Sequence, residues 1–123
     1  MERVATQMEY AKGTIYSHFP NKEEIVLAIA VESMELRRNL FEQSAYVTGA
    51  ARLRMMALGV ACEFYTQHCT EDFLVEQCIR NQSIWDRSSE QRQNLIRQCE
   101  GQCLEIVAGI VRNRLCNSLS LRR

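Results

Sequence analysis

The sequence predicts an all-α protein, and three observations carry that prediction. No stretch alternates polar and apolar residues for long enough to form a convincing β-strand. The 123 residues include one proline and five glycines, so few positions interrupt helices. Apolar side chains instead recur at intervals of three and four residues, as in amphipathic helices, and the 46% hydrophobic content is enough for a folded core.

Two short helices are predicted at the N-terminus, over residues 2–8 and 12–17. Between them we expect a turn near Glu9-Tyr10-Ala11. Each helix is too short to be stable alone, so both must pack against something else.

A third helix is predicted to begin just after the only proline, Pro20. Proline disfavours helical geometry at Phe19, and Asn21 can then cap the new helix. Glu24 is placed to return a hydrogen bond to the Asn21 amide, as in a capping box. Helical spacing continues to about Gln43, and its apolar positions are Ile25, Val26, Ile29, Ala30, Leu36, Leu40 and Phe41.

Three more helices are predicted after a break at residues 44–49. The first is expected to turn one apolar face to the core, formed by Leu53, Met56, Ala57, Val60, Ala61 and Phe64. The second begins at Thr70 and ends near Trp85. The last follows Ser88-Ser89 and runs to about Arg114, with a stripe of Leu95, Cys99, Cys103, Ile106 and Ile110. Residues 116–123 are expected to fray.

This pattern divides the chain into a small head with a linker helix, residues 1–43, and a helical body, residues 44–123. No apolar run approaches the roughly 18 residues needed to cross a bilayer, and no signal-peptide pattern opens the chain. We therefore expect a cytoplasmic location and no membrane partner.

Global charge does not favour a nucleic-acid partner, because 15 Lys and Arg balance 15 Asp and Glu. The local picture differs. Residues 10–22 contain Lys12, His18 and Lys22 and no acidic residue. We expect a small electropositive surface there.

The sequence does not indicate an enzyme, a cofactor or a metal site. The six cysteines all lie in helix-patterned segments, and Cys99 and Cys103 share an apolar stripe, so core packing of reduced thiols is favoured. A cysteine-based redox switch is the alternative. The acidic residues are explained without catalysis, since Glu23 and Glu24 lie in a capping turn and the other two, Asp72 and Glu76, are expected on a solvent face.

The segment before Pro20 has the organisation of a helix-turn-helix, in which one helix braces a second that enters the major groove. Bracing is assigned to Val4, Ala5 and Met8, and the buried side of the reading helix to Ile15 and Phe19. The residues left facing outward are Lys12, Gly13, Thr14, Ser17 and His18. Short polar and cationic groups of this kind suit groove and phosphate contacts.

These residues resemble the DNA-binding signature of the tetracycline-repressor (TetR) family of bacterial regulators, in which Lys-Gly-Thr-aliphatic-Tyr, an aromatic Phe and Lys-Glu match residues 12–23. The resemblance covers residues 1–43. It implies that residues 12–17 form the recognition helix, that Tyr16 and His18 approach phosphate or groove, and that Lys22 holds a phosphate. Gly13 would permit close approach.

The chain departs from the family pattern at several points. Glu9 stands where the family usually has its turn glycine, and Ala11 replaces a small polar residue before the reading helix. The family also has a complete helix before the one that begins here, and two further helices after Arg114. The head, and the part of the body that forms dimers, are therefore expected to be truncated.

The resemblance implies a ligand-responsive repressor with an operator in double-stranded DNA, a small-molecule effector and a homodimeric state. Candidate effector-pocket residues in the body are Met56, Phe64, Tyr65 and Trp85, for which core packing is the alternative. A helical fragment that self-associates without specific DNA binding is the alternative function.

Overall fold

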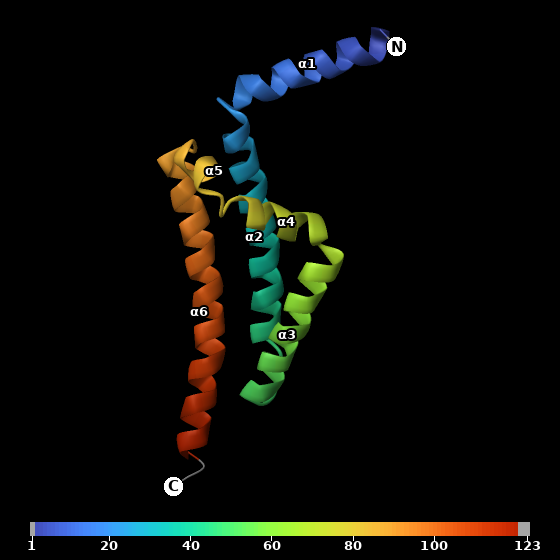
Figure 1. Ribbon diagram of the computed structural model, residues 1–123. Helices are drawn as coiled ribbons and strands as arrows, with labels where there is room; N and C mark the ends of the chain where they lie inside the picture. The colour runs from blue at the N-terminus through green and yellow to red at the C-terminus, as the bar shows by residue number, and fades with distance from the viewer. Residues whose placement is uncertain (1, 121–123) are drawn as a thin grey trace.

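The computed structural model describes the backbone of residues 2–120 and the side chains of residues 3, 6, 7, 9 and 11–113. The helices in this part of the chain are α1 (Glu2–His18), α2 (Lys22–Ala45), α3 (Ala51–His68), α4 (Thr70–Cys78), α5 (Gln82–Asp86) and α6 (Glu90–Ser120). No strand occurs among these residues, which confirms the all-α prediction. Helices α2, α3 and α6 form the bundle, α4 and α5 connect α3 to α6, and α1 extends away from one end (Figure 1).

The N-terminal segment is one helix, α1, and not two short helices joined by a turn. The predicted turn at residues 9–11 consists of Glu, Tyr and Ala, none of which breaks a helix, and it lacks the glycine that would favour a bend. Because α1 stands away from the bundle, no packing favours a bend either (Figure 1). The two predicted helices therefore merge.

Helix α2 begins as predicted. The Asn21 side chain accepts a hydrogen bond from the Glu24 amide at 2.9 Å, and the helix continues to Ala45, two residues beyond the predicted end. Glu24 does not return a bond to Asn21, since its carboxylate is engaged with residues at the start of α6. The capping box is therefore only half formed.

The turn between α2 and α3 requires a glycine. Gly49 has a φ of 116°, and a Cβ atom there would lie 2.8 Å from Leu53 Cδ1. The conformation and the contact both exclude a side chain. This explains why the helical pattern breaks at the predicted place.

Helix α3 packs on the face opposite to the predicted one. Its buried residues are Ala51, Leu58 and Tyr65, whereas the predicted core stripe is largely exposed, with Met56 at 59% and Val60 at 67%. Both faces have helical spacing, so periodicity shows which residues share a face but not which face is covered. Hydrogen bonds from Tyr65 to α2 and α4 favour the observed orientation.

The last two predicted helices have different bounds in the structure. The helix from Thr70 ends at Cys78, and Trp85 lies in the separate short helix α5, which Asn81 caps through the Ser83 amide. Helix α6 continues to Ser120, whereas an end near Arg114 was predicted. Residues 121–123 of the predicted frayed tail lie outside the described residues.

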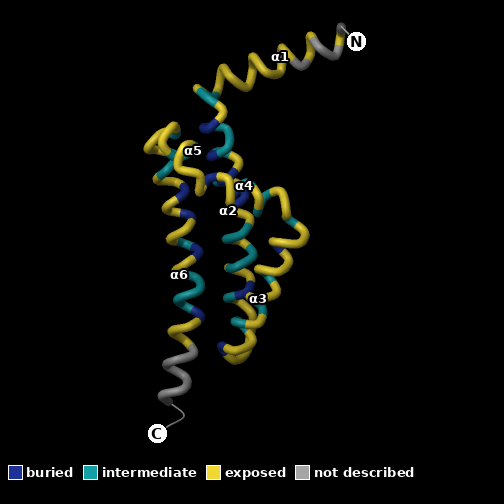
Figure 2. The backbone as a smooth tube through the Cα atoms, in the orientation of Figure 1, coloured by how far each residue is buried: buried dark blue, intermediate teal, exposed yellow. Residues whose placement is uncertain are grey.

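The main apolar core lies between the first half of α2, the α4–α5 connection and the start of α6 (Figure 2). Its buried members are Leu27, Ala30, Met34, Ile79, Ile96 and Cys99. Cys103 is also buried, so core packing of Cys99 and Cys103 is confirmed, although Leu95 is 40% exposed and Ile96 takes its place. Among the described residues, no helix combines the length and apolar character needed to cross a bilayer.

Candidate nucleic-acid interface

Helix α1 is accessible to a large partner along its described length. It projects from the end of the bundle, and every described side chain from residue 3 to residue 18 is exposed (Figure 2). The side chains of Val4, Ala5 and Met8, predicted to brace the reading helix, lie outside the described residues. Ile15 is 46% exposed, so its predicted burial is wrong, because the merged helix has no bracing partner.

The predicted DNA-contacting residues divide between two sides of α1. At about 100° per residue, Lys12, Gly13, Tyr16 and Ser17 occupy one arc of the helix surface. Thr14 and His18 lie on the other side, one turn apart, and the Ser17 hydroxyl donates a hydrogen bond to the Thr14 carbonyl at 2.6 Å. One arc therefore presents an ammonium group, a phenol, a hydroxyl and a site without a side chain.

Gly13 leaves open space on this arc. A Cβ atom built there would meet nothing within 4 Å, and the residue lies within a regular helix. Among the described residues, neither packing nor backbone conformation requires glycine at this position. Close approach of another molecule to the backbone would require it.

The turn after α1 is held by contacts with Arg87, which precedes α6, and with Arg92 in the first turn of α6. Phe19 is half-buried, with the Arg92 guanidinium carbon 5.2 Å from the centre of its ring. Asn21 Nδ2 donates to the Arg87 carbonyl at 3.2 Å, and Lys22, the first residue of α2, is exposed. The position of Lys22 beside the end of α1 is therefore fixed by these contacts.

Two of the acidic residues that flank the electropositive segment have their charge balanced by an arginine. Glu24 is 5% exposed and accepts hydrogen bonds from the Ser89 amide, the Ser89 hydroxyl and Arg92 Nε, the last at 2.6 Å. Glu23 is 6% exposed and lies 3.5 Å from Arg87 Nη1. Glu9 is thus the flanking acid that stays exposed beside the segment.

The contacts of Glu24 determine its charge state. Burial alone would raise the pKa of Glu24, but the hydrogen bonds from Ser89 and the nearby Arg92 guanidinium outweigh burial, and the pKa is lowered from its ordinary value of 4.5. Glu24 is therefore ionised at neutral pH. Helix-dipole stabilisation alone, as expected from the sequence, does not account for this residue.

Glu24→Gln is expected to destabilise the fold by about 1 kcal/mol at neutral pH, because a neutral amide cannot replace the charged hydrogen bonds. Since the folded pKa is lowered, this stabilisation is present above a pH of about 4.5 and is lost as the pH falls through the folded pKa. Urea unfolding should thus separate variant and parent at about pH 7 and not at about pH 3. Glu32→Gln, at an exposed position on α2, is the control and should change little at either pH.

Comparison with known families adds one match. Residues 1–29 match the family described as "Bacterial regulatory proteins, tetR family". Over this segment the chain is similar to tetR-family regulators. The matched segment contains every residue predicted above to contact DNA. No curated protein and no solved structure matches the chain.

The residues predicted to line an effector pocket are not brought together. Met56 is exposed on α3, and Tyr65 is 2% exposed and packs toward α2 and α4. Phe64 lines an open groove between α2 and α3, whereas Trp85 lines a different groove beside α5 and α6. The sequence placed these residues in one body but could not predict which faces of α3 and α5 meet.

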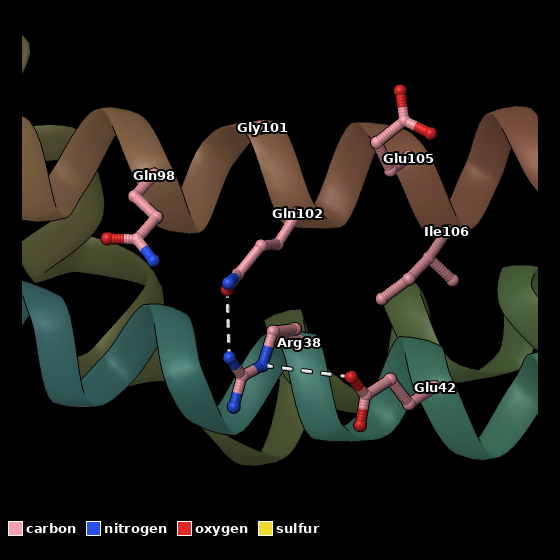
Figure 3. A pocket seen from close by; sticks show the side chains of 7 residues that line it. All are labelled: Arg38, Glu42, Gln98, Gly101, Gln102, Glu105 and Ile106. Carbon is pink, nitrogen blue, oxygen red and sulfur yellow. Dashed lines mark hydrogen bonds and ion pairs between the residues drawn. The ribbon is translucent and has the colours of Figure 1, made fainter.

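Two grooves flank the contact between α2 and α6. The one in Figure 3 is bridged by polar side chains, since Arg38 Nη1 donates to Gln102 Oε1 at 2.8 Å and Arg38 Nε lies 4.0 Å from Glu42. The other has a volume of about 300 Å³ and combines two arginines with apolar walls. It is lined by Arg37, Phe41, Arg80, Glu100, Cys103, Leu104 and Val107.

A buried polar cluster, which we call the α2–α4 cluster, was not predicted. It consists of Ser33, Arg37, Tyr65, Asp72 and Glu76. Glu76 is 5% exposed and accepts hydrogen bonds from Arg37 Nη1 at 2.5 Å and from Tyr65 Oη at 2.6 Å. The Ser33 hydroxyl donates to Asp72 at 2.7 Å. The predicted solvent position of Glu76 is therefore wrong, because α4 turns it toward α2.

Cys99 and Cys103 have the chemistry of core residues, whereas Cys62 and Cys78 are exposed and Cys69 is half-buried. Burial, as the largest cause, raises the pKa of both the Cys99 and the Cys103 thiols, which keeps them protonated and weakly nucleophilic at neutral pH. Among the described residues, no group of three His, Cys, Asp or Glu side chains is arranged to hold a metal ion.

Proposed function

We propose that this chain is a DNA-binding transcription regulator that contacts double-stranded operator DNA with α1 and the first turn of α2. One observation carries the proposal. The tetR-family segment presents exposed polar and cationic side chains, without an acidic residue from position 10 to position 22, on a helix that stands clear of the bundle. A helix in that position can approach a major groove without a steric clash with the body.

In this proposal the arc of α1 that carries Lys12, Gly13, Tyr16 and Ser17 faces the DNA. Lys12 and Lys22 pair with phosphates, and Gly13 allows the helix backbone to come close. Tyr16 and Ser17 donate hydrogen bonds to phosphate oxygens or base edges, with Thr14 and His18 at the margin. The Glu24 contacts with α6 hold Lys22 in place beside α1.

We also propose that the chain is a cytoplasmic, homodimeric repressor that responds to a small molecule. Residues 1–43 would serve as head and linker helix and residues 44–123 as body. The groove lined by Arg37 and Arg80 supports an effector that combines an anionic group with an apolar part, because cationic and apolar groups converge there. Arg37 lies in the middle of α2, and α1 is joined to the start of α2. A ligand that shifts α2 against α6 would therefore also reorient α1.

Lys22→Ala tests the DNA-binding proposal. Loss of one phosphate contact should weaken binding about fivefold at low salt and reduce the slope of log affinity against log salt by about 0.9. We would measure fluorescence anisotropy of a labelled duplex, roughly three helical turns long with a randomised centre, between about 50 and 200 mM salt. Tyr16→Phe should weaken binding less and leave the slope unchanged.

Arg112→Ala is the matched control, because this exposed arginine lies far along α6 from α1 and pairs only with the exposed Glu105 among the ion pairs of the described residues. It should leave affinity and slope unchanged. Absence of binding at the lowest salt, or an equal loss in Lys22→Ala and Arg112→Ala, would contradict DNA contact through α1 and α2.

A further inference from the structure

The groove beside Arg37, with its volume of about 300 Å³, has a polar end and an apolar end. Helices α2 and α6, which supply most of its walls, run in the same direction (Figure 1). On α2, Arg37 lies one turn before Phe41, and on α6, Glu100 lies one turn before Leu104. The charged side chains are therefore nearer the helix starts, and the apolar walls continue beyond them to Val107.

Arg80 belongs to the polar end of this groove. Arg80 and Glu100 both line it, and the same two residues also line the neighbouring groove beside α5, so they stand where the two grooves meet. The neighbouring groove lies toward the start of α6, because Ile96 also lines it. The polar end thus carries two guanidinium groups and one carboxylate.

Two of the three charged groups at the polar end have no counter-ion. The charge of Arg37 is balanced by Glu76, whose carboxylate lies 2.5 Å from Arg37 Nη1. Arg80 and Glu100 are both exposed, and neither takes part in the ion pairs formed by the described residues. One positive and one negative charge are therefore left unpaired beside the apolar walls.

We infer that this groove binds a free α-amino acid with an apolar side chain. The ligand carboxylate pairs with Arg80 and the ligand ammonium group pairs with Glu100, while its side chain lies against Phe41, Leu104 and Val107. A carboxylic acid without the ammonium group would be repelled by Glu100, and an amine without the carboxylate would be repelled by Arg80. The volume lies at the lower limit of ligand pockets, which suits a single amino acid.

The inference rests on the effector part of the proposed function and narrows it to one class of ligand. The proposed effector combines an anionic group with an apolar part, and Glu100 adds an ammonium group as a third requirement. The test contains no DNA, so its outcome does not depend on whether α1 contacts an operator.

Isothermal titration calorimetry of the full chain with L-phenylalanine tests the site. We expect a dissociation constant on the order of 100 µM. Two analogues each lack one charge: hydrocinnamate has no ammonium group and phenethylamine has no carboxylate. Both should bind about tenfold more weakly. Trp85, the only tryptophan of the chain, lines the adjoining groove with Arg80 and Glu100, so its emission should change during the phenylalanine titration.

Glu100→Gln should reverse the preference between two of these ligands. Phenylalanine should bind about tenfold more weakly, whereas hydrocinnamate should bind more tightly than it binds the parent, because the like charge is gone. A purely structural defect would weaken both. Arg80→Gln should act in the same way on phenylalanine and phenethylamine. Glu105→Gln is the matched control, since this exposed carboxylate on α6 lines other grooves, and it should change none of the affinities.

Three results would overturn the inference. The first is that neither L-phenylalanine nor L-leucine binds at about 10 mM. The second is that the parent binds hydrocinnamate as tightly as phenylalanine; the anionic effector of the proposed function would then stand, and only the ammonium site at Glu100 would fail. The third is an equal loss of phenylalanine affinity in Glu100→Gln and Glu105→Gln.

Discussion

Glu76→Ala is expected to destabilise the fold by about 3 kcal/mol, the largest effect of any substitution considered for this chain. Glu76 is the centre of the α2–α4 cluster, where one of its carboxylate oxygens accepts from Arg37 and the other from Tyr65. Removing the carboxylate leaves a guanidinium group that is mostly buried, with a side-chain exposure of 22%, and a buried phenol without their partner. Desolvated polar groups without partners cost more than the lost bonds alone.

Urea unfolding followed by circular dichroism would measure this effect, with Glu105→Ala as the matched control. Glu105 also pairs with an arginine, Arg112, at 3.2 Å, but the side-chain exposures of this pair are 76% and 66%. Ion pairs of that kind contribute little, so no measurable change is expected. Equal effects of the two substitutions would show that the α2–α4 cluster does not hold α4 on α2.

Tyr65→Phe separates the hydroxyl from the carboxylate. Burial, followed by the adjacent Glu76 carboxylate, raises the pKa of Tyr65, so the hydroxyl remains a donor throughout the physiological pH range. Its loss should cost about 1 kcal/mol, because Arg37 still neutralises Glu76. A loss as large as that of Glu76→Ala would place the main contribution in the phenol instead.

The fold class and most helix starts could be predicted because their causes are local. Pro20 and Asn21 determine where α2 begins, and Gly49 ends the preceding segment, each through the conformation of one or two residues. The predicted division of α1 into two helices is wrong, because the turn expected at residues 9–11 does not form. The local propensity of that turn favours a helix, and no tertiary contact opposes it.

The α2–α4 cluster and the Glu24 contacts could not be predicted from the sequence, because their partners are far apart in the chain. Ser33 and Asp72 are 39 residues apart, and Glu24 and Arg92 are 68 residues apart. A carboxylate at a helix start or on a helix surface has the same sequence pattern whether it contacts solvent or a distant arginine. Only the packing of α2 against α4 and α6 decides between these outcomes.

For the proposed DNA-contacting residues, exposure could be predicted from the sequence, but burial against another helix could not. Short-range patterns placed Lys12 on an outer surface, and the family resemblance implied DNA contacts for Tyr16 and Lys22; all three side chains are exposed. The predicted burial of Ile15 required a bracing helix folded back on the reading helix. Without a bend near residue 9, that contact does not form.

Glu9→Gly is expected to tighten DNA binding at least tenfold. Glycine inside a helix costs about 1 kcal/mol relative to good helix formers, so it would favour a bend between the two halves of α1. A bend would let the first half brace the second and bury Ile15, which is the arrangement that a helix-turn-helix needs to insert its reading helix into the major groove. The substitution also removes the acid that stays exposed beside the electropositive segment.

Glu9→Gln separates these two causes, because it removes the charge while keeping a good helix former. It should tighten binding only two- to threefold, through weaker phosphate repulsion, with a matching change in salt dependence. The further gain of Glu9→Gly should persist at higher salt and coincide with a small loss of helicity by circular dichroism. Identical affinities of the glycine and glutamine variants would show that α1 binds DNA as the straight helix, without the bend.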